Sequence, residues 1–178
     1  MYRIIFLLAL TIGLIACRGN DKVVGAWEVN DVYHSTMIAT NPATGEKTYQ
    51  GPPINTMDAA NTYEMFSLRS IKPTNGNASY ELQVQLTYFG TWRYYDAAAV
   101  RNKPTDAFKV VSREAGICEE RGCIFKELLA IKLSDAFIKD NISGFEISIS
   151  SKSGQSSVIY VPPQYIKGYL KAVEGKNY

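Results

Sequence analysis

Apolar and polar residues alternate most regularly along residues 80–88 of this chain. The apolar positions there are Tyr80, Leu82, Val84, Leu86 and Tyr88. A period of two is typical of a strand that turns one face to a core and the other to water. Gly90 interrupts the pattern, and the sequence TWRYYD at 91–96 predicts a partner strand beyond it. With a further strand predicted at 62–70, these segments indicate an antiparallel meander.

Shorter segments of strand-like composition occur along the rest of the chain. Their β-branched and aromatic residues favour extended structure and predict strands at 23–33, 108–113, 124–133, 145–149 and 158–161. Residues 35–61 differ, because Asn41-Pro42, Thr44-Gly45 and Gly51-Pro52-Pro53 are turn signals. We predict a long loop there, interrupted by one short strand at 47–50.

Two helices are predicted late in the chain. Ser134 is placed to cap a short helix at 135–140. Pro163 suits the start of a second helix at 163–174, because its missing N–H would be unpaired there, and Gly175 ends that helix. Its apolar stripe consists of Tyr165, Ile166, Tyr169, Leu170 and Val173. The predicted fold class is mainly β, at the border of α+β: an antiparallel β-sandwich or barrel-like sheet with the C-terminal helix packed on it.

The chain begins with an apolar segment. One cation, Arg3, precedes an uncharged and predominantly apolar run at 4–16. As a helix that run spans about 20 Å, less than the ~30 Å hydrocarbon core of a membrane, so it predicts a secretory signal and not a permanent span. It ends in Leu14-Ile15-Ala16-Cys17, which resembles the lipobox of bacterial lipoproteins. The alternative is an ordinary cleaved signal that happens to precede a cysteine.

The resemblance implies cleavage and lipidation at Cys17. In that family the signal peptide, here residues 1–16, is removed, and the cysteine becomes the acylated first residue that anchors the protein to a membrane. Two or more acyl chains hold a protein durably, whereas one binds only marginally. Arg18 stands where the family's inner-membrane retention signal has Asp, so the resemblance implies the outer membrane, facing the periplasm. Residues 17–22 are then the lipidated cysteine and its tether, and 23–178 form a single β-rich domain.

The remaining cysteines form a candidate pair. Once Cys17 carries lipid, Cys118 and Cys123 are left, separated by Glu-Glu-Arg-Gly. In an oxidising periplasm this pair predicts a structural disulfide, worth only about 2 kcal/mol because the loop is short. A redox pair and half of a zinc site are the alternatives. A redox pair usually has two intervening residues, and the sequence offers no second Cys or His pair to complete a zinc site.

Candidate catalytic residues are few. His34 is the chain's one histidine, and the sequence contains no G-x-S-x-G, P-loop or EF-hand motif, so we expect no metal and no cofactor. A solvated loop position is the preferred interpretation of His34. Glu114, Glu119, Glu120 and Glu127 cluster around the cysteines, where a charged hairpin turn is the preferred interpretation. The formal net charge of +2 gives no reason to expect a nucleic-acid partner.

Aromatic residues supply the positive functional signal. They make up 12% of the chain, and Tyr88, Trp92 and Tyr94 lie close together in sequence. Exposed aromatic side chains bind sugars or protein surfaces, although strands also favour aromatics for packing. The predicted function is a lipid-anchored, non-enzymatic envelope protein. It would bind a protein partner or a cell-wall component through these residues and the 41–58 loop, with the membrane as its other partner.

Two alternative functions stay open. An inhibitor or immunity-type lipoprotein would capture a hydrolase with a rigid protruding loop, for which 35–61 and 114–123 are the candidates. A carboxylate-based hydrolase is the least favoured function. It would require Glu119, Glu120 or Glu127 to line a concave pocket, since a glycosidase needs two carboxylates facing one another across a cleft.

Overall fold

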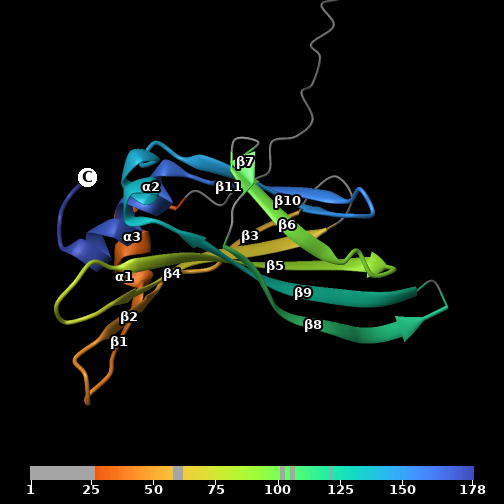
Figure 1. Cartoon of the computed structure of the whole chain (residues 1–178), viewed down its shortest axis with the longest axis horizontal. Coiled ribbons are helices and arrows are strands. Elements are labelled where there is room, and N and C mark those ends of the chain that lie inside the picture. The colour runs from red at the N-terminus through yellow and green to blue at the C-terminus, as the bar shows by residue number, and fades with distance from the viewer. Residues whose placement is uncertain (1–26, 58–61, 101–102, 105–106, 121) are drawn as a thin grey trace, which may run out of the picture.

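The computed structural model describes residues 27–57, 62–100, 103–104, 107–120 and 122–178 (Figure 1). The predicted signal peptide, Cys17 and the tether lie outside these ranges. Within them the chain is mainly β, as predicted, with antiparallel sheets and three helices. None of the helices in the described ranges has the length and hydrophobicity to span a bilayer.

The larger sheet has seven strands within the described residues, in the order β1-β2-β4-β5-β9-β8, with β3 also pairing with β4. Their bounds are β1 Met37–Thr40, β2 Lys47–Gln50, β3 Ile54–Met57, β4 Tyr63–Lys72, β5 Ser79–Gly90, β8 Phe108–Glu119 and β9 Gly122–Leu133. The alternation predicted for 80–88 is confirmed: all five apolar side chains are buried, and the polar ones between them are half-buried on the other face. That strand therefore forms the centre of the sheet.

The smaller sheet lies over the inner face of the larger one (Figure 1). Its order is β11-β10-β6-β7. The bounds are β6 Tyr95–Val100, β7 Lys103–Pro104, β10 Phe145–Ser151 and β11 Ser156–Val161. Buried residues of both sheets belong to one hydrophobic cluster. Over the described residues the two sheets thus form a sandwich, and the barrel-like alternative is not what the chain adopts.

Both predicted helices are present. Ser134 caps α2 (Asp135–Asp140) by accepting a hydrogen bond of 3.0 Å from the Phe137 N–H. α3 (Pro163–Glu174) ends at Gly175, whose φ of +72° is the left-handed geometry of a helix C-cap. Its buried side chains are Tyr165, Ile166, Tyr169, Leu170 and Val173, which is the predicted stripe.

Hydrogen bonds of the tyrosine hydroxyls of α3 hold the helix against the larger sheet. Tyr165 Oη donates to the carbonyl of Pro52 (2.8 Å) and accepts from the Leu68 N–H (3.1 Å). Tyr169 Oη bonds with Ser70 Oγ at 2.9 Å. Because both rings are buried, these hydroxyls need such partners, and the bonds fix where the helix lies on the sheet.

A carboxylate cluster joins α3 to α2. Glu174 pairs with Lys139 of α2 at 2.9 Å and accepts hydrogen bonds from Tyr80 (3.4 Å) and Tyr178. Burial opposes ionisation of Glu174, but the hydrogen bonds and the nearby cation outweigh it and lower the pKa of its carboxyl.

The strand predicted at 23–33 is wrong over its described part, where α1 (Val29–Ser35) forms instead. The Asp31 carboxylate accepts the N–H of Glu28 at 3.3 Å and so satisfies a donor at the start of this helix. α1 packs against α3 at Gly168, where a Cβ would lie 2.4 Å from a carbonyl oxygen of α1. This close tertiary contact overrides the β propensity of the local sequence.

The strand predicted at 91–96 does not pair with β5. The chain leaves the larger sheet at Gly90 (φ +121°), turns through Tyr94 (φ +53°) and enters the smaller sheet as β6. β5 pairs with β9 instead, with Tyr88 opposite Phe125. The meander is therefore confirmed for β4 and β5 and wrong for its third strand, because the positive φ angles redirect the chain between layers.

The long loop predicted at 35–61 contains three short strands within its described residues. The short strand at 47–50 is confirmed as β2, and β1 and β3 lie on either side of it in sequence. The turn signals mark the tight connections between these strands, as in the Asn41 N–H to Glu46 carbonyl bond of 2.8 Å. The other predicted strands are confirmed, and β8 and β9 extend as one long hairpin.

Candidate functional site

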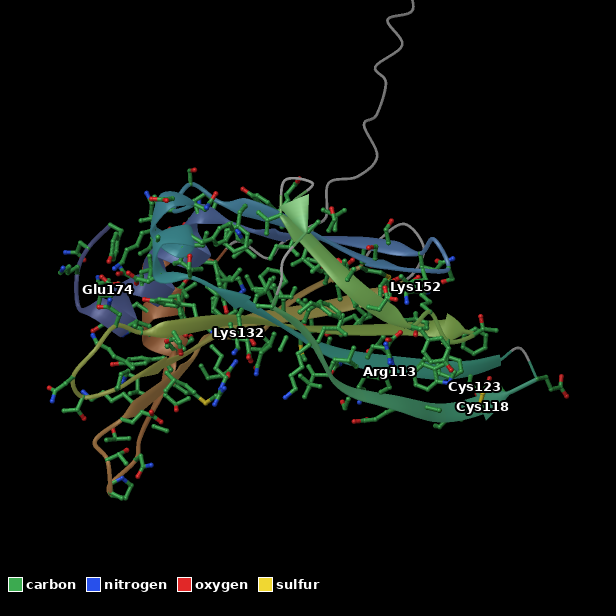
Figure 2. The ribbon with its side chains drawn as sticks, viewed as in Figure 1. Arg113, Cys118, Cys123, Lys132, Lys152 and Glu174 are labelled. Carbon is green, nitrogen blue, oxygen red and sulfur yellow. A yellow bond between two sulfur atoms is a disulfide. The ribbon has the colours of Figure 1, made fainter. Side chains whose placement is uncertain are left out.

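The β8–β9 hairpin reaches farthest at one end of the molecule, and several side chains predicted to be functional gather there (Figure 1). Figure 2 shows Arg113, Lys152 and the disulfide at this end. The hairpin turn carries the predicted Cys118–Cys123 disulfide, which joins residues directly opposite each other in the two strands. The predicted disulfide between Cys118 and Cys123 is thus present.

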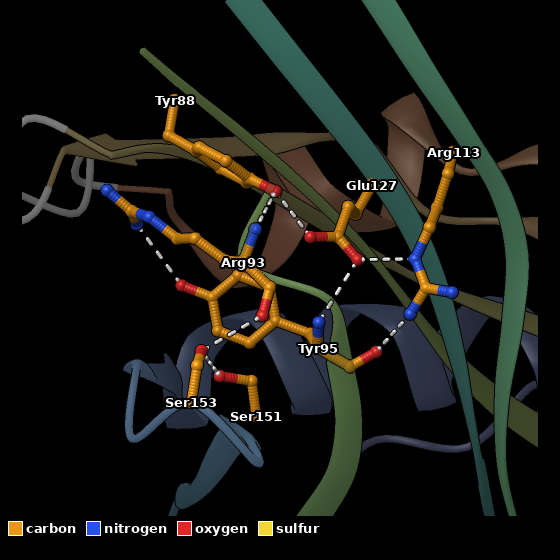
Figure 3. A network of polar contacts seen from close by, with 7 residues as sticks. All are labelled: Tyr88, Arg93, Tyr95, Arg113, Glu127, Ser151 and Ser153. Atoms are coloured by element: carbon orange, nitrogen blue, oxygen red, sulfur yellow. Dashed lines mark hydrogen bonds and ion pairs between the residues drawn. The ribbon is translucent and has the colours of Figure 1, made fainter. Parts of the chain in front are cut away.

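A fully buried carboxylate, Glu127, holds this end together (Figure 3). One oxygen accepts a hydrogen bond of 2.5 Å from Tyr88 Oη. The other accepts from Arg113 Nε at 2.8 Å and from the Tyr95 N–H at 3.1 Å. Arg113 also donates to the Tyr95 carbonyl at 2.8 Å. Since Tyr95 begins β6, the carboxylate links three strands of the larger sheet to the smaller sheet.

Arg93 fixes the segment between the two sheets. Its N–H donates to Tyr88 Oη (3.0 Å), and its guanidinium lies over the Tyr88 ring, 4.2 Å from the centroid. The guanidinium also donates to Thr62 Oγ1 (2.7 Å) and Tyr95 Oη (3.2 Å). Ser153, in the β10–β11 turn, donates to the Arg93 carbonyl at 3.3 Å. Burial and the bond to the neighbouring carboxylate raise the pKa of Tyr88, so its hydroxyl stays protonated as a donor.

Trp92 and Tyr94 form the accessible surface above this network, and we call these two residues the aromatic platform. Their rings stack with centroids 5.6 Å apart and an interplanar angle of 26°. Trp92 rests on Phe125 at 4.4 Å, and the guanidinium of Arg113 lies 5.2 Å from the centroid of the Tyr94 ring. Tyr94 is 54% exposed, so these contacts leave more than half of its surface open to solvent.

The backbone of Tyr94 is strained. Its φ of +53° is uncommon for any residue but glycine and is an outlier for a bulky side chain. Such strain persists where surrounding contacts determine the conformation, and it concentrates at functional sites. Here the neighbouring residues on both sides, Arg93 and Tyr95, are held by the Glu127 network. The network therefore presents the Tyr94 ring outward in a fixed position.

The three predicted binding residues thus differ in accessibility. Tyr88 is 2% exposed and supports the platform from inside, so it is not a contact residue. Trp92 is half-buried and Tyr94 is exposed. The described part of the expected 41–58 loop forms turns and the strands β2 and β3. β2 pairs with 69–72 toward the other end of the larger sheet, whereas β3 pairs with 63–66, beside the end of β5 that carries Tyr88.

The four glutamates around the cysteines do not converge. Glu127 faces the core, whereas Glu114 lies on the opposite face of the hairpin and pairs with Lys126 at 3.6 Å. Glu119 and Glu120 are exposed at the hairpin turn. Glu127 and Glu114 therefore lie on opposite faces of the hairpin and do not form the facing pair that the hydrolase hypothesis requires.

The predicted histidine is exposed and lies in the last turn of α1, with its ring edge-on to that of Tyr33. His34 is thus in a helix and not in the expected loop. Among the described residues, no group of three or more His, Cys, Asp or Glu side chains is arranged to hold a metal ion.

Sequence reasoning missed the network, although one signal pointed to it. Along β9 the buried positions alternate, and Glu127 occupies one of them between Phe125 and Leu129. A carboxylate in an apolar register needs an internal partner, because an unpaired buried charge is costly. The partner, Arg113, stands directly opposite it in β8.

Comparison of the chain with protein-family models, with curated proteins and with solved structures finds no match.

Proposed function

We propose that this protein is a lipid-anchored component of a bacterial envelope that binds another envelope component through the aromatic platform, without catalysing a reaction. The observation that carries the proposal is the exposed Tyr94 ring, held on a strained backbone by a buried network. A rigid aromatic side chain loses little entropy on binding, and aromatic residues dominate the affinity of many interfaces.

The anchor is supported by the sequence ending in Cys17, which resembles a lipobox. Residues 17–27, fully extended, reach about 35 Å, so the domain stays close to the membrane surface. The disulfide suits an oxidising compartment such as the periplasm. Arg18 favours the outer membrane over the inner one.

Two experiments test the proposal separately. Native protein should incorporate labelled palmitate and fractionate with membranes, and Cys17→Ser should abolish both; a native protein that takes up no label contradicts the anchor. For binding, purified protein is incubated with solubilised envelope, cross-linked and recovered. Tyr94→Ala should lower the recovered adduct by about ten-fold, equivalent to ~1.4 kcal/mol.

The matched control for the binding test is Phe89→Ala. Phe89 is similarly exposed, at 48%, but faces the opposite side of the larger sheet, across from Ile124. Phe89→Ala should leave the amount of recovered adduct unchanged. Equal recovery with the native protein and Tyr94→Ala would exclude the aromatic platform as the binding surface.

One observation supports the inhibitor-type function as a second candidate. The disulfide closes a rigid hairpin end at which Ile117 is 72% exposed, and such an end suits insertion into the cleft of a hydrolase. In this case Ile117→Asp should abolish capture of the enzyme, whereas Tyr94→Ala should affect it little. The two variants therefore distinguish the two functions.

A further inference from the structure

The turn between β4 and β5, residues 73–78, contains the chain's one Asn-Gly pair, Asn75-Gly76. Both residues are exposed. The turn precedes β5, whereas the aromatic platform follows it, so the two lie at opposite ends of this strand (Figure 1). The chemistry of the pair is therefore independent of the proposed function.

The fold requires glycine at the second position of the pair. Gly76 has a φ of +154°, a conformation that side chains disfavour, and a Cβ there would lie 3.1 Å from Cγ of Pro73. Within the described ranges the Gly76 N–H makes no hydrogen bond. Its nitrogen is thus exposed and has no partner that holds it in place.

The side chain of Asn75, in contrast, has no structural role within the described part of the chain. Asparagine in a turn commonly bonds to the backbone two residues on, as Asn41 does, where Oδ1 accepts from the Ala43 N–H at 3.0 Å. The Asn75 amide makes no such bond with any described residue. It can therefore rotate against the backbone that follows it.

We propose that Asn75 converts to aspartate and isoaspartate without an enzyme, which makes this turn a modification site. The Gly76 nitrogen bonds to Cγ of Asn75, the Cγ–Nδ2 bond breaks, and ammonia leaves with the proton from the Gly76 nitrogen. The two groups are adjacent in the chain, so the attack is intramolecular. Water then opens the cyclic imide. Cleavage at Cγ gives aspartate, whereas cleavage at the Asn75 carbonyl carbon gives isoaspartate; no atom is oxidised or reduced.

The following residue makes Asn75 the most reactive asparagine of the described ranges. Glycine has no Cβ to hinder the approach of its nitrogen. Asn41 precedes proline, which has no N–H to lose. Asn30 and Asn55 lie within α1 and β3, whose regular backbone restricts the approach. Asn77 shares the turn but precedes an alanine.

The conversion changes both the charge and the main chain of the turn. Either product is ionised at neutral pH, so a neutral amide becomes an anion. Isoaspartate also adds a methylene to the main chain beside Thr74. The Thr74 hydroxyl donates to the Thr44 carbonyl at 2.9 Å, so the altered turn is the one that contacts the β1–β2 turn.

The test incubates detergent-solubilised full-length protein in water enriched in heavy oxygen and then digests it with trypsin in ordinary water for mass spectrometry. The peptide containing Asn75 should gain one heavy oxygen and separate into aspartate and isoaspartate forms. Above neutral pH the rate should rise about ten-fold per pH unit, because the Gly76 nitrogen attacks after losing its proton. It should stay within about ten-fold of the rate in a free peptide of residues 72–78.

Two variants locate the reaction. Asn75→Gln keeps an amide but needs a larger ring for the attack, so the labelled product should be lost. Asn77→Gln is the matched control, because Asn77 is exposed in the same turn, and it should leave the label at Asn75 unchanged. Absence of label at Asn75, a rate more than about ten-fold below that of the peptide, or equal labelling in Asn75→Gln overturns the inference.

Discussion

Replacing Glu127 by alanine tests whether one buried carboxylate holds the two sheets together at the platform. The carboxylate accepts hydrogen bonds from Tyr88, Arg113 and the Tyr95 N–H, and none of it is exposed. Alanine removes every acceptor at once. The Tyr88 hydroxyl and the Tyr95 N–H are then left in a buried site.

The loss of stability in Glu127→Ala depends on which of the former donors to this carboxylate can bind water in the variant. Each buried donor left without a partner costs about 1–3 kcal/mol, whereas Arg113 is partly exposed and recovers some hydration. We expect Glu127→Ala to lower the free energy of unfolding by about 4 kcal/mol, close to the ~3–5 kcal/mol for breaking a buried ion pair. For a domain of this size the melting temperature should fall by about 10 °C.

Glu127→Gln removes the charge but can keep two of the three hydrogen bonds that the carboxylate accepts. Its oxygen can accept from Arg113 and Tyr95, and its amide can donate to Tyr88 Oη, which has a second lone pair beside the one facing the Arg93 N–H. The charge is lost, and the Tyr88 O–H, which donates to Glu127 in the native protein, is left without that acceptor, so we expect a loss of about 2–3 kcal/mol.

Urea unfolding followed by tryptophan fluorescence and by circular dichroism measures both variants, and coincident curves justify a two-state analysis. Glu114→Ala is the control, because that residue makes an exposed ion pair and should change stability by less than about 0.5 kcal/mol. A Glu127→Ala protein within about 1 kcal/mol of the native one would refute the role assigned to this network.

Three further predictions concern the scaffold. Gly168→Ala should destabilise the protein by about 1–3 kcal/mol in urea, because its Cβ would overlap α1, whereas Gly154→Ala meets open space and bears only backbone strain. Replacing Cys118 and Cys123 together by serine should cost about 2 kcal/mol, and the loss should match that produced in the native protein by a reductant. The pKa of Glu174 is lowered in the folded protein, so its contribution to stability is present above the unfolded pKa and is lost as the pH falls through the folded pKa. Glu174→Gln should therefore make the free energy of unfolding fall less steeply with decreasing pH at acidic pH. An unchanged slope would contradict this.

Much of the fold is predictable because β5 and α3 have regular patterns of apolar and polar residues within their own sequences. Buried and half-buried residues alternate along residues 80–88 of β5, and every apolar residue of the predicted α3 stripe is buried. The division into a buried and a more exposed face therefore predicts both elements from the sequence alone. The failures occur where a distant contact decides the structure. α1 has strand-like residues, but α3 approaches it at Gly168, a contact that local propensity does not reveal.

The sequence predicts only part of the candidate site, because the position of its aromatic residues also depends on structure that local patterns do not reveal. Aromatic character predicts the accessible position of Tyr94 and the partly accessible one of Trp92, whereas the same prediction is wrong for Tyr88, because a buried and an exposed tyrosine look alike in sequence. The turn from Gly90 to Tyr94, both of which have a positive φ, takes the chain to the other sheet and determines which aromatic side chain faces water. The side-chain pattern contains no trace of that change of layer.

The pairing of β5 with β9 has a consequence for how the chain reaches its native state. Gly90 lies opposite Cys123 and Tyr80 opposite Leu133, so the pairing at the middle of the larger sheet joins two strands between which β6, β7 and β8 lie in sequence. Pairings between residues so far apart in sequence slow folding relative to local hairpins, because the entropy of closing the loop is lost first. Until β9 pairs with it, the apolar face of β5 stays open to other chains, and such surfaces favour aggregation during folding.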